Sequence, residues 1–163
     1  MIKGFTLIEL LTTLAISSIV LFFSGGFYGE FLQRQKVTSD INRITSIISS
    51  ARNHAISQRQ NVDICGFVDQ QCSNQWYKIQ VTNENNEMIY QDTLVADYSH
   101  VVWSAFQRKP NLEFRPNGFT NHQNGTLYLC HKKFSSLNRA IVISKSGRVS
   151  IDKNTNALDE RCK

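Results

Sequence analysis

The chain has 163 residues, of which 41% are hydrophobic and 19% charged, and its formal net charge is +5. These values are typical of a folded chain with a core and exclude intrinsic disorder, and the length suits one anchor segment plus one modest domain. The basic balance permits anionic partners such as nucleic acid or lipid headgroups without requiring either.

An apolar segment begins almost at once, in the sequence KGFTLIELLTTLAISSIVLFF from Lys3 to Phe23. It is close to the ~20 residues that an α-helix needs to cross a bilayer. Glu9 is the exception, because a carboxylate at the centre of a membrane helix costs about 2.5–3.5 kcal/mol. A secretory signal cleaved near Ser24-Gly25-Gly26 and a plain membrane anchor are two simpler interpretations, and neither explains Glu9.

The helical pattern continues beyond Gly25-Gly26 to about Ser57. Apolar residues recur there at alternating steps of four and three, which predicts the buried face of an amphipathic helix. The residues of this face are Val37, Ile41, Ile44, Ile48, Ala51 and Ala55. We interpret the charged residues at the other positions as a solvated face: Arg34, Lys36, Asp40, Arg43, Arg52 and Arg59.

From Asn61 onward the periodicity changes to short strands separated by turn signals, including a tight hairpin turn expected at Asn124-Gly125. The predicted strands are Val62–Phe67, Trp76–Val81, Met88–Leu94, Val101–Phe106, Leu112–Phe114, Thr126–Cys130, Ala140–Ser144 and Arg148–Ile151. Strands of this length and spacing favour an antiparallel sheet or two packed sheets, with Trp76 and Trp103 in the core. The predicted fold class is therefore α+β, a long N-terminal helix packed on a C-terminal antiparallel β domain.

Four cysteines, Cys65, Cys72, Cys130 and Cys162, follow the apolar segment at spacings that match no common zinc site. An even number of cysteines after a membrane-targeting segment suggests an oxidising compartment and disulfides. Three pairings are possible, and we favour Cys65–Cys72, which closes a short loop, with Cys130–Cys162, which ties the C-terminal tail to a strand.

Catalytic chemistry finds no support in the sequence. The four histidines, His54, His100, His122 and His131, lie far apart, and no nucleophile motif or phosphate-binding glycine loop accompanies them. We therefore expect no enzyme activity, no catalytic residues, no metal and no cofactor.

The stretch Gly4-Phe5-Thr6-Leu7-Ile8-Glu9 resembles the type III signal of type IV pilins and type II secretion pseudopilins. The resemblance implies that a prepilin peptidase cuts after Gly4 and methylates Phe5. It also implies a role for Glu9 in assembly, since its carboxylate can neutralise the Phe5 amine of a neighbouring subunit inside an apolar fibre.

Two later stretches, residues 124–130 and 139–149, are similar to the GspH/FimT/FimU branch of minor pilins and pseudopilins. The resemblance implies a leader (1–4), a transmembrane and assembly helix (5–28), its amphipathic continuation (29–58) and a periplasmic β-rich domain (59–163). Such a protein is a structural subunit, held in the inner membrane by one span, that helps initiate or cap a type IV pilus or secretion pseudopilus at its tip. Its partners would be other pilins or pseudopilins, the prepilin peptidase and the inner membrane.

The alternative function is DNA binding for uptake in natural transformation, because basic residues dominate the sequence after His131. They are Lys132, Lys133, Arg139, Lys145, Arg148, Lys153, Arg161 and Lys163. Some FimT-like minor pilins bind DNA through a Gly-Arg-x-Arg motif, which here reads Gly147-Arg148-Val149-Ser150, with Ser150 in place of the second arginine. We therefore expect at most weak, non-specific DNA binding, and only if these residues form one patch.

Overall fold

The computed structural model describes residues 6–69, 71–154, 158 and 160–162, without the side chains of residues 22–27. The chain forms two compact units, Met1–Gln35 and Lys36–Lys163. We call them the stem and the domain. One helix, α1 (Leu7–Gln58), contributes residues to both.

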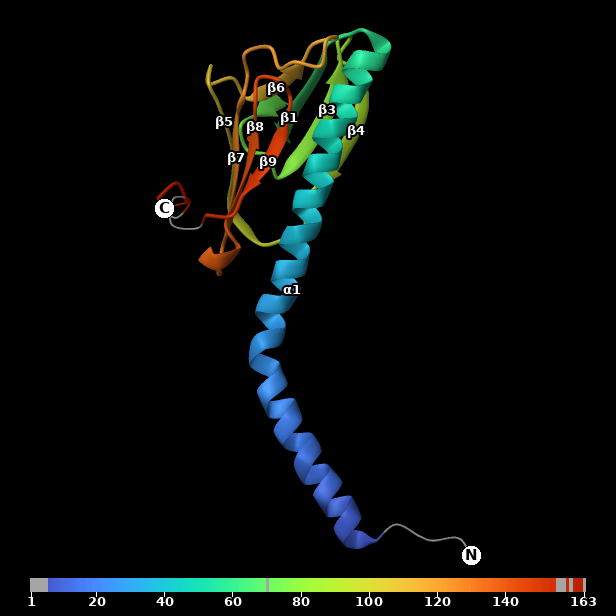
Figure 1. Ribbon diagram of the computed structural model, residues 1–163, viewed down its shortest axis with the longest axis vertical. Coiled ribbons are helices and arrows are strands. Elements are labelled where there is room, and N and C mark those ends of the chain that lie inside the picture. Colours follow the sequence, from blue (N-terminus) through green and yellow to red (C-terminus); the bar gives the residue numbers. More distant parts are fainter. Residues whose placement is uncertain (1–5, 70, 155–157, 159, 163) are drawn as a thin grey trace, which may run out of the picture. The chain divides into compact units, whose positions relative to one another are not determined.

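Within the domain, α1 packs the predicted apolar face into the core (Figure 1). All six residues predicted for this face are at most 7% exposed, so the prediction of an amphipathic helix is confirmed. Ile47 adds a seventh buried apolar side chain that the spacing did not single out.

The first sheet is antiparallel, with β1 (Val62–Val68) at its centre. One side of β1 pairs with β3 (Lys78–Asn83), which pairs in turn with the edge strand β4 (Met88–Thr93). The other side pairs with β6 (Asn111–Phe114) along its first half and with the short β2 (Gln71–Ser73) along its second.

The second sheet has the order β5-β7-β8-β9 and is also antiparallel. Its strands are β5 (Tyr98–Ala105), β7 (Gly125–His131), β8 (Arg139–Ile143) and β9 (Val149–Asp152). A short 3₁₀ helix, η1 (Ser135–Leu137), lies between β7 and β8.

The two tryptophans connect the sheets at the centre of the core. Trp76 and Trp103 are 0% and 2% exposed, and their rings stack with centroids 5.1 Å apart. The backbone N–H of Trp76 donates to the Val101 carbonyl, and the backbone N–H of Trp103 donates to the Asn74 carbonyl, both at 2.8 Å. The prediction that both side chains belong to the core is confirmed.

The α+β class is confirmed, and each predicted strand corresponds to an observed one. Strand β2 and helix η1 were not predicted from the sequence, because each is only three residues long. The hairpin turn expected at Asn124-Gly125 is wrong, because Gly125 opens β7, which pairs with β5 and β8 rather than with the preceding β6.

The charged positions of α1 need a larger correction. Asp40 is fully buried, and its carboxylate accepts hydrogen bonds from the backbone N–H groups of Val95 (3.1 Å) and Ala96 (2.9 Å). Two other predicted surface charges are also used, Arg43 in an ion pair with Asp92 and Arg52 as a donor to the Gly118 carbonyl. These contacts fix the helix to strand β4 and to two loops of the domain, so Asp40, Arg43 and Arg52 are not part of a solvated face. Arg34, Lys36 and Arg59 are exposed, as predicted.

Both favoured disulfides are present. Cys65 of β1 is bonded to Cys72 of β2, and Cys130 near the end of β7 is bonded to Cys162 in the tail. His100 of β5 also contacts this tail, through Nε2 at 3.3 Å from the Cys162 carbonyl.

Candidate assembly site at the start of helix α1

The described part of the N-terminal motif begins at Thr6, so the expected processing residues Gly4 and Phe5 lie outside the described residues. Thr6 stands just before α1, and Glu9 lies in the first helical turn. The Thr6 backbone N–H donates to Glu9 Oε2 at 3.3 Å, and the Glu9 N–H donates to the Thr6 hydroxyl at 3.3 Å. This reciprocal pair is a capping box, which satisfies donors that a helix start leaves unpaired.

The capping box fixes the position of the Glu9 carboxylate. Its carboxylate is held at the N-terminal end of the helix, where the helix dipole favours a negative group. The role of Thr6 was not predicted, although the spacing Thr-x-x-Glu before an apolar run is a sequence signal for this cap. Thr6 is thus a positioning residue for the carboxylate expected to act in assembly.

The stem helix presents apolar side chains on all its described sides. Nine large ones are 54–77% exposed: Leu7, Ile8, Leu10, Leu11, Leu14, Ile16, Ile19, Val20 and Leu21. Large exposed apolar surfaces of this kind mark contacts with a membrane or with other proteins. Among the described residues, however, none of the helices is both long enough and apolar enough to cross a membrane.

The hydroxyl groups of the stem do not interrupt this apolar surface. The Thr12 and Thr13 hydroxyls donate to the Glu9 and Leu10 carbonyls at 3.0 and 2.9 Å. The Ser17 hydroxyl donates to the Thr13 carbonyl at 2.7 Å, and the Ser18 hydroxyl donates to the Ala15 carbonyl at 2.8 Å. These four hydroxyls are therefore satisfied within their own helix and need no water.

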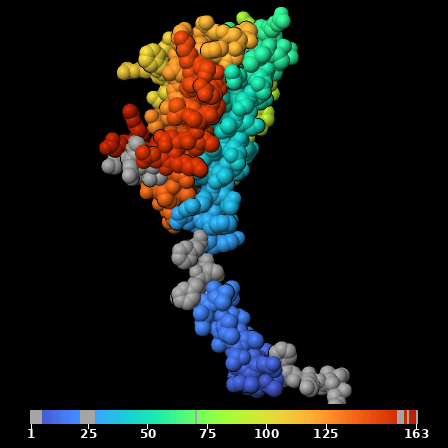
Figure 2. All heavy atoms as spheres, in the orientation of Figure 1, coloured from blue at the N-terminus to red at the C-terminus, as the bar shows by residue number. Residues whose placement is uncertain are grey.

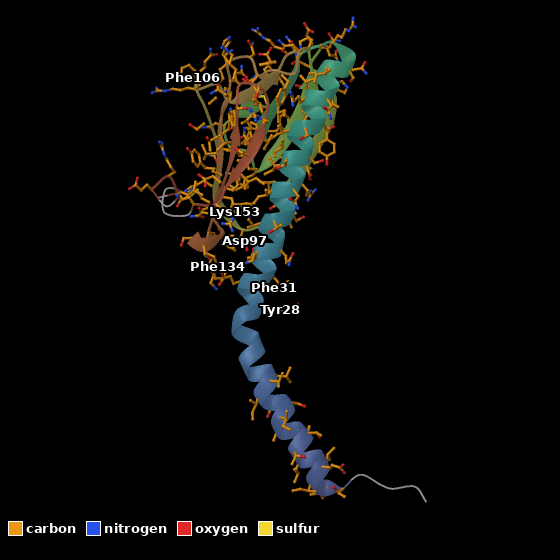
Figure 3. All side chains as sticks on the ribbon, viewed as in Figure 1. Tyr28, Phe31, Asp97, Phe106, Phe134 and Lys153 are labelled. Atoms are coloured by element: carbon orange, nitrogen blue, oxygen red, sulfur yellow. A yellow bond between two sulfur atoms is a disulfide. The ribbon has the colours of Figure 1, made fainter. Side chains whose placement is uncertain are left out.

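The basic residues after His131 do not form one patch. Lys145 and Arg148 are exposed at the turn between β8 and β9, whereas Lys132, Lys133 and Arg139 lie at the opposite end of β8. Figure 3 shows Lys153 at that opposite end too, near Phe134 and Asp97, with Phe106 at the other end of the domain. At ~3.3 Å per strand residue the two groups are roughly 20 Å apart, while Arg161 follows the tail and Lys163 lies outside the described residues.

The histidines remain apart in the fold, and no cluster of three or more His, Cys, Asp or Glu side chains able to hold a metal occurs among the described residues. His131 is structural: its Nδ1 accepts hydrogen bonds from the backbone N–H groups of Lys133 and Phe134, both at 3.1 Å. Burial lowers the pKa of His131, opposed by the nearby Asp97 carboxylate, so the ring stays neutral and can accept both bonds.

Comparison with known families decides what this architecture is. Residues 40–147 match the family described as type II transport protein GspH, which covers more than half of the chain. The chain belongs to the GspH family. Residues 1–24 match the prokaryotic N-terminal methylation motif, which contains the expected processing site.

Solved structures show the same fold for the GspH-family chain. The type IV minor pilin FimU of Pseudomonas aeruginosa PAO1, crystallised in space group P21, has a TM-score of 0.59 and 19% identity, over 75% of this chain and 92% of FimU. A second FimU crystal form, P65, gives a TM-score of 0.55 and 17% identity, over 71% and 91% of the two chains. No curated protein sequence gives a significant match.

The GspH-family protein is therefore a structural subunit of the minor pilin or pseudopilin kind. The methylation motif and the family together imply an N-terminal helix that anchors the protein in a membrane, and other pilins as its partners.

Proposed function

We propose that the GspH-family protein is a minor pilin or pseudopilin that helps initiate or cap a type IV pilus or a type II secretion pseudopilus. It is cut after Gly4 by the prepilin peptidase, methylated on Phe5, and held in the inner membrane by a single span with its domain in the periplasm. It then enters the tip of the fibre. The observation that carries the proposal is the capping box, which fixes the Glu9 carboxylate at the start of an apolar helix.

The assembly step follows from the charges. Cleavage after Gly4 creates an amine on Phe5, one helical turn from Glu9. Within a bundle of apolar helices an unpaired amine and an unpaired carboxylate are both costly, and pairing them between neighbouring subunits offsets much of that cost. The pair also sets the axial register of one subunit against the next, as single polar pairs do in coiled coils.

N-terminal processing is tested by mass spectrometry of the purified protein. The chain should begin at Phe5 and carry one added methyl group. An intact Met1, or cleavage near Gly25, would contradict the proposal.

Three variants separate the charge of Glu9 from its cap. Glu9→Gln keeps the capping box, which tolerates glutamine, but removes the charge, so membrane insertion should be retained while incorporation into sheared fibres falls. Thr6→Ala weakens the cap by ~1 kcal/mol and loosens the position of the carboxylate but keeps its charge, so incorporation should fall less than it does for Glu9→Gln. Glu30→Ala is the matched control, because Glu30 is an acid of the same helix in an exposed ion pair with Arg34. Equal incorporation of Glu9→Gln and the unmodified protein would refute the pairing.

Weak DNA binding is the second candidate, supported by the exposed Lys145 and Arg148 at the β8–β9 turn. A patch of this size should bind duplex DNA only in the non-specific range, roughly 10⁻⁴–10⁻⁶ M. Fluorescence anisotropy of the detergent-solubilised protein should show salt-sensitive binding that Arg148→Ala reduces. Tight binding that persists at about 200 mM salt would make DNA uptake the primary function.

A further inference from the structure

The hairpin that joins β3 and β4 is acidic. No lysine or arginine occurs from Ile79 to Gln107, whereas this stretch contains Glu84, Glu87, Asp92 and Asp97. Glu84 and Glu87 are exposed on the hairpin that joins the two strands. In a chain of net charge +5, this hairpin is a local surface of opposite sign.

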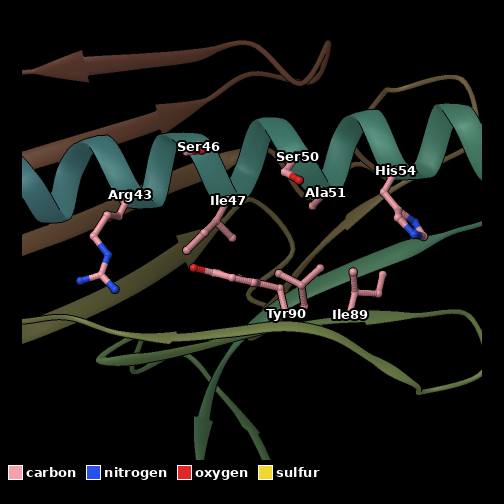
Figure 4. Close-up of a pocket in the computed structure, with 9 residues that line it drawn as sticks. Arg43, Ser46, Ile47, Ser50, Ala51, His54, Ile89 and Tyr90 are labelled. Carbon is pink, nitrogen blue, oxygen red and sulfur yellow. The ribbon is translucent and has the colours of Figure 1, made fainter.

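A groove of about 430 Å³ lies between strand β4 and helix α1 (Figure 4). Its floor consists of Ile47, Ala51 and Val81, which are at most 6% exposed, and its wall is formed by Ile89 and Tyr90. Polar groups stand at its ends, with Arg43 paired to Asp92 at one and His54 at the other. The groove is thus apolar inside, and the charge of Arg43 at its end is neutralised by Asp92.

A β-bulge creates the wall of this groove. Val81 pairs with Tyr90 and Thr82 with Met88, so Ile89 is an extra residue in β4. The bulge interrupts the alternation of side chains, and Ile89 and Tyr90 both point toward the helix (Figure 4). Bulges that re-aim a side chain in this way are over-represented at sheet edges and next to functional sites.

The edge beside the groove lacks the usual protection against pairing with another chain. Strand β4 contains no lysine or proline, and Met88, Ile89 and Tyr90 are 60%, 38% and 47% exposed. By contrast, β5 at an edge of the second sheet is covered by the segment before β3, through the bonds of Trp76 and Trp103.

The β8–β9 hairpin has the complementary chemistry. Lys145 and Arg148 are exposed at its turn, and two apolar side chains of the same hairpin, Val142 and Ile151, are 37% and 41% exposed. Within the domain, β9 and β4 lie on opposite sides of α1 (Figures 1 and 2). The basic hairpin of a chain therefore faces away from its own groove and from the acidic hairpin beside it, but it can meet those of a second copy.

We propose that the groove between α1 and β4 is a docking site for the β8–β9 hairpin of a second copy of this chain. Arg148 of one copy would approach Glu87 and the face of Tyr90 on the next, which combines a charge pair with a cation–π contact. Because the two surfaces differ, the contact is head-to-tail rather than two-fold symmetric. The proposal rests on the proposed function in that it adds a contact between domains to the contact between stems.

Photo-crosslinking of the full chain in detergent micelles tests the proposal. With p-benzoylphenylalanine in place of Tyr90, irradiation should give covalent dimers whose crosslinked peptide comes from residues 142–153 of the second copy. The control carries the same group in place of Phe106, an 80% exposed aromatic residue away from the groove, and should give no such peptide. This control also measures the non-specific crosslinking that arises when the stems of two chains share one micelle.

Charge reversal identifies the contact. Glu87→Lys and Arg148→Glu should each lower the crosslinked fraction several-fold, since each replaces an attraction by a repulsion at the rim. The two changes combined in one chain should restore it. Circular dichroism would establish that each variant is folded.

Three results would overturn the inference: no dimer from position 90, a crosslinked peptide from elsewhere in this chain or from another protein, or singly reversed variants that crosslink as well as the parent. Absence of the crosslink in a protein that is still cut after Gly4 and incorporated into fibres would refute the domain contact alone. Failure of both cleavage and incorporation would instead refute the proposed function.

Discussion

The buried carboxylate of Asp40 provides a direct test of how the domain holds its helix. It accepts hydrogen bonds from the N–H groups of Val95 and Ala96 in the loop between β4 and β5, and it lies close to the buried Tyr98. Burial, and then the Asp40 charge, raise the pKa of Tyr98 well above its ordinary range, so its hydroxyl remains protonated.

Asp40→Ala should destabilise the domain strongly. The change leaves two N–H donors facing a space that the carboxylate filled, and an unsatisfied buried donor costs about 1–3 kcal/mol. The expected loss in the free energy of unfolding is therefore roughly 2–6 kcal/mol, a large part of the ~5–15 kcal/mol of an ordinary domain. Denaturant unfolding of the full chain in detergent, followed by tryptophan emission, measures it.

Two comparisons sharpen this test. Asp40→Asn retains one acceptor oxygen and should fall between Asp40→Ala and the parent. Glu84→Ala removes an exposed acid from the β3–β4 hairpin and should change the free energy of unfolding by less than about 0.5 kcal/mol. If Asp40→Ala were as stable as Glu84→Ala, the hydrogen bonds from Val95 and Ala96 to Asp40 would contribute nothing to stability, and the prediction would be refuted.

Three further outcomes are expected. Replacing Cys130 and Cys162 together by serine should lower the free energy of unfolding by roughly 3–4 kcal/mol in the chain-entropy model, because the disulfide closes a long loop with a sequence separation of 32. An unchanged denaturation midpoint would contradict this. The pKa of His131 is lowered in the folded chain, so its stabilising contribution is complete above the ordinary pKa of about 6.5 and is lost as pH falls toward the pKa of the folded state. His131→Asn should therefore reduce the difference in the free energy of unfolding between pH 7.5 and 5.5. A difference equal to that of the parent would contradict this prediction. Gly147→Ala should lower the free energy of unfolding by more than about 1 kcal/mol, since the φ of Gly147 is +74° and a Cβ would lie 2.7 Å from the Gly118 carbonyl oxygen. Thermal melting of the variant measures this, and a Tm equal to that of the parent would refute it.

The sequence predicts the elements of this fold well, because they depend on local patterns. The apolar spacing from Val37 to Ala55 is a property of one helix, and it predicts the buried face without knowledge of what covers it. The strands follow in the same way from alternation and turn residues, and the capping box at Thr6 and Glu9 could have been read from four consecutive residues.

The interactions between elements could not be predicted by the same means. Asp40 reads as one more surface charge, since nothing near it in sequence reveals that the N–H groups of Val95 and Ala96 will face it. The separation of the basic residues could not be predicted for a related reason, because Arg139 and Lys145 are close in sequence but Arg139 begins β8 and Lys145 lies beyond its far end. The bulge at Ile89 depends on the register of β4 against β3, which the sequence of either strand alone does not contain.

The stacked tryptophans have a practical consequence for spectroscopy of the intact protein. The chain contains two tryptophans, Trp76 and Trp103, and both belong to the domain, while the stem has none. Their rings are 5.1 Å apart and buried, so unfolding of the domain should separate the pair and expose both indoles to solvent. Tryptophan fluorescence, and exciton coupling of the two indoles in circular dichroism, thus report the folded state of the domain alone, whatever lipid, detergent or fibre surrounds the stem.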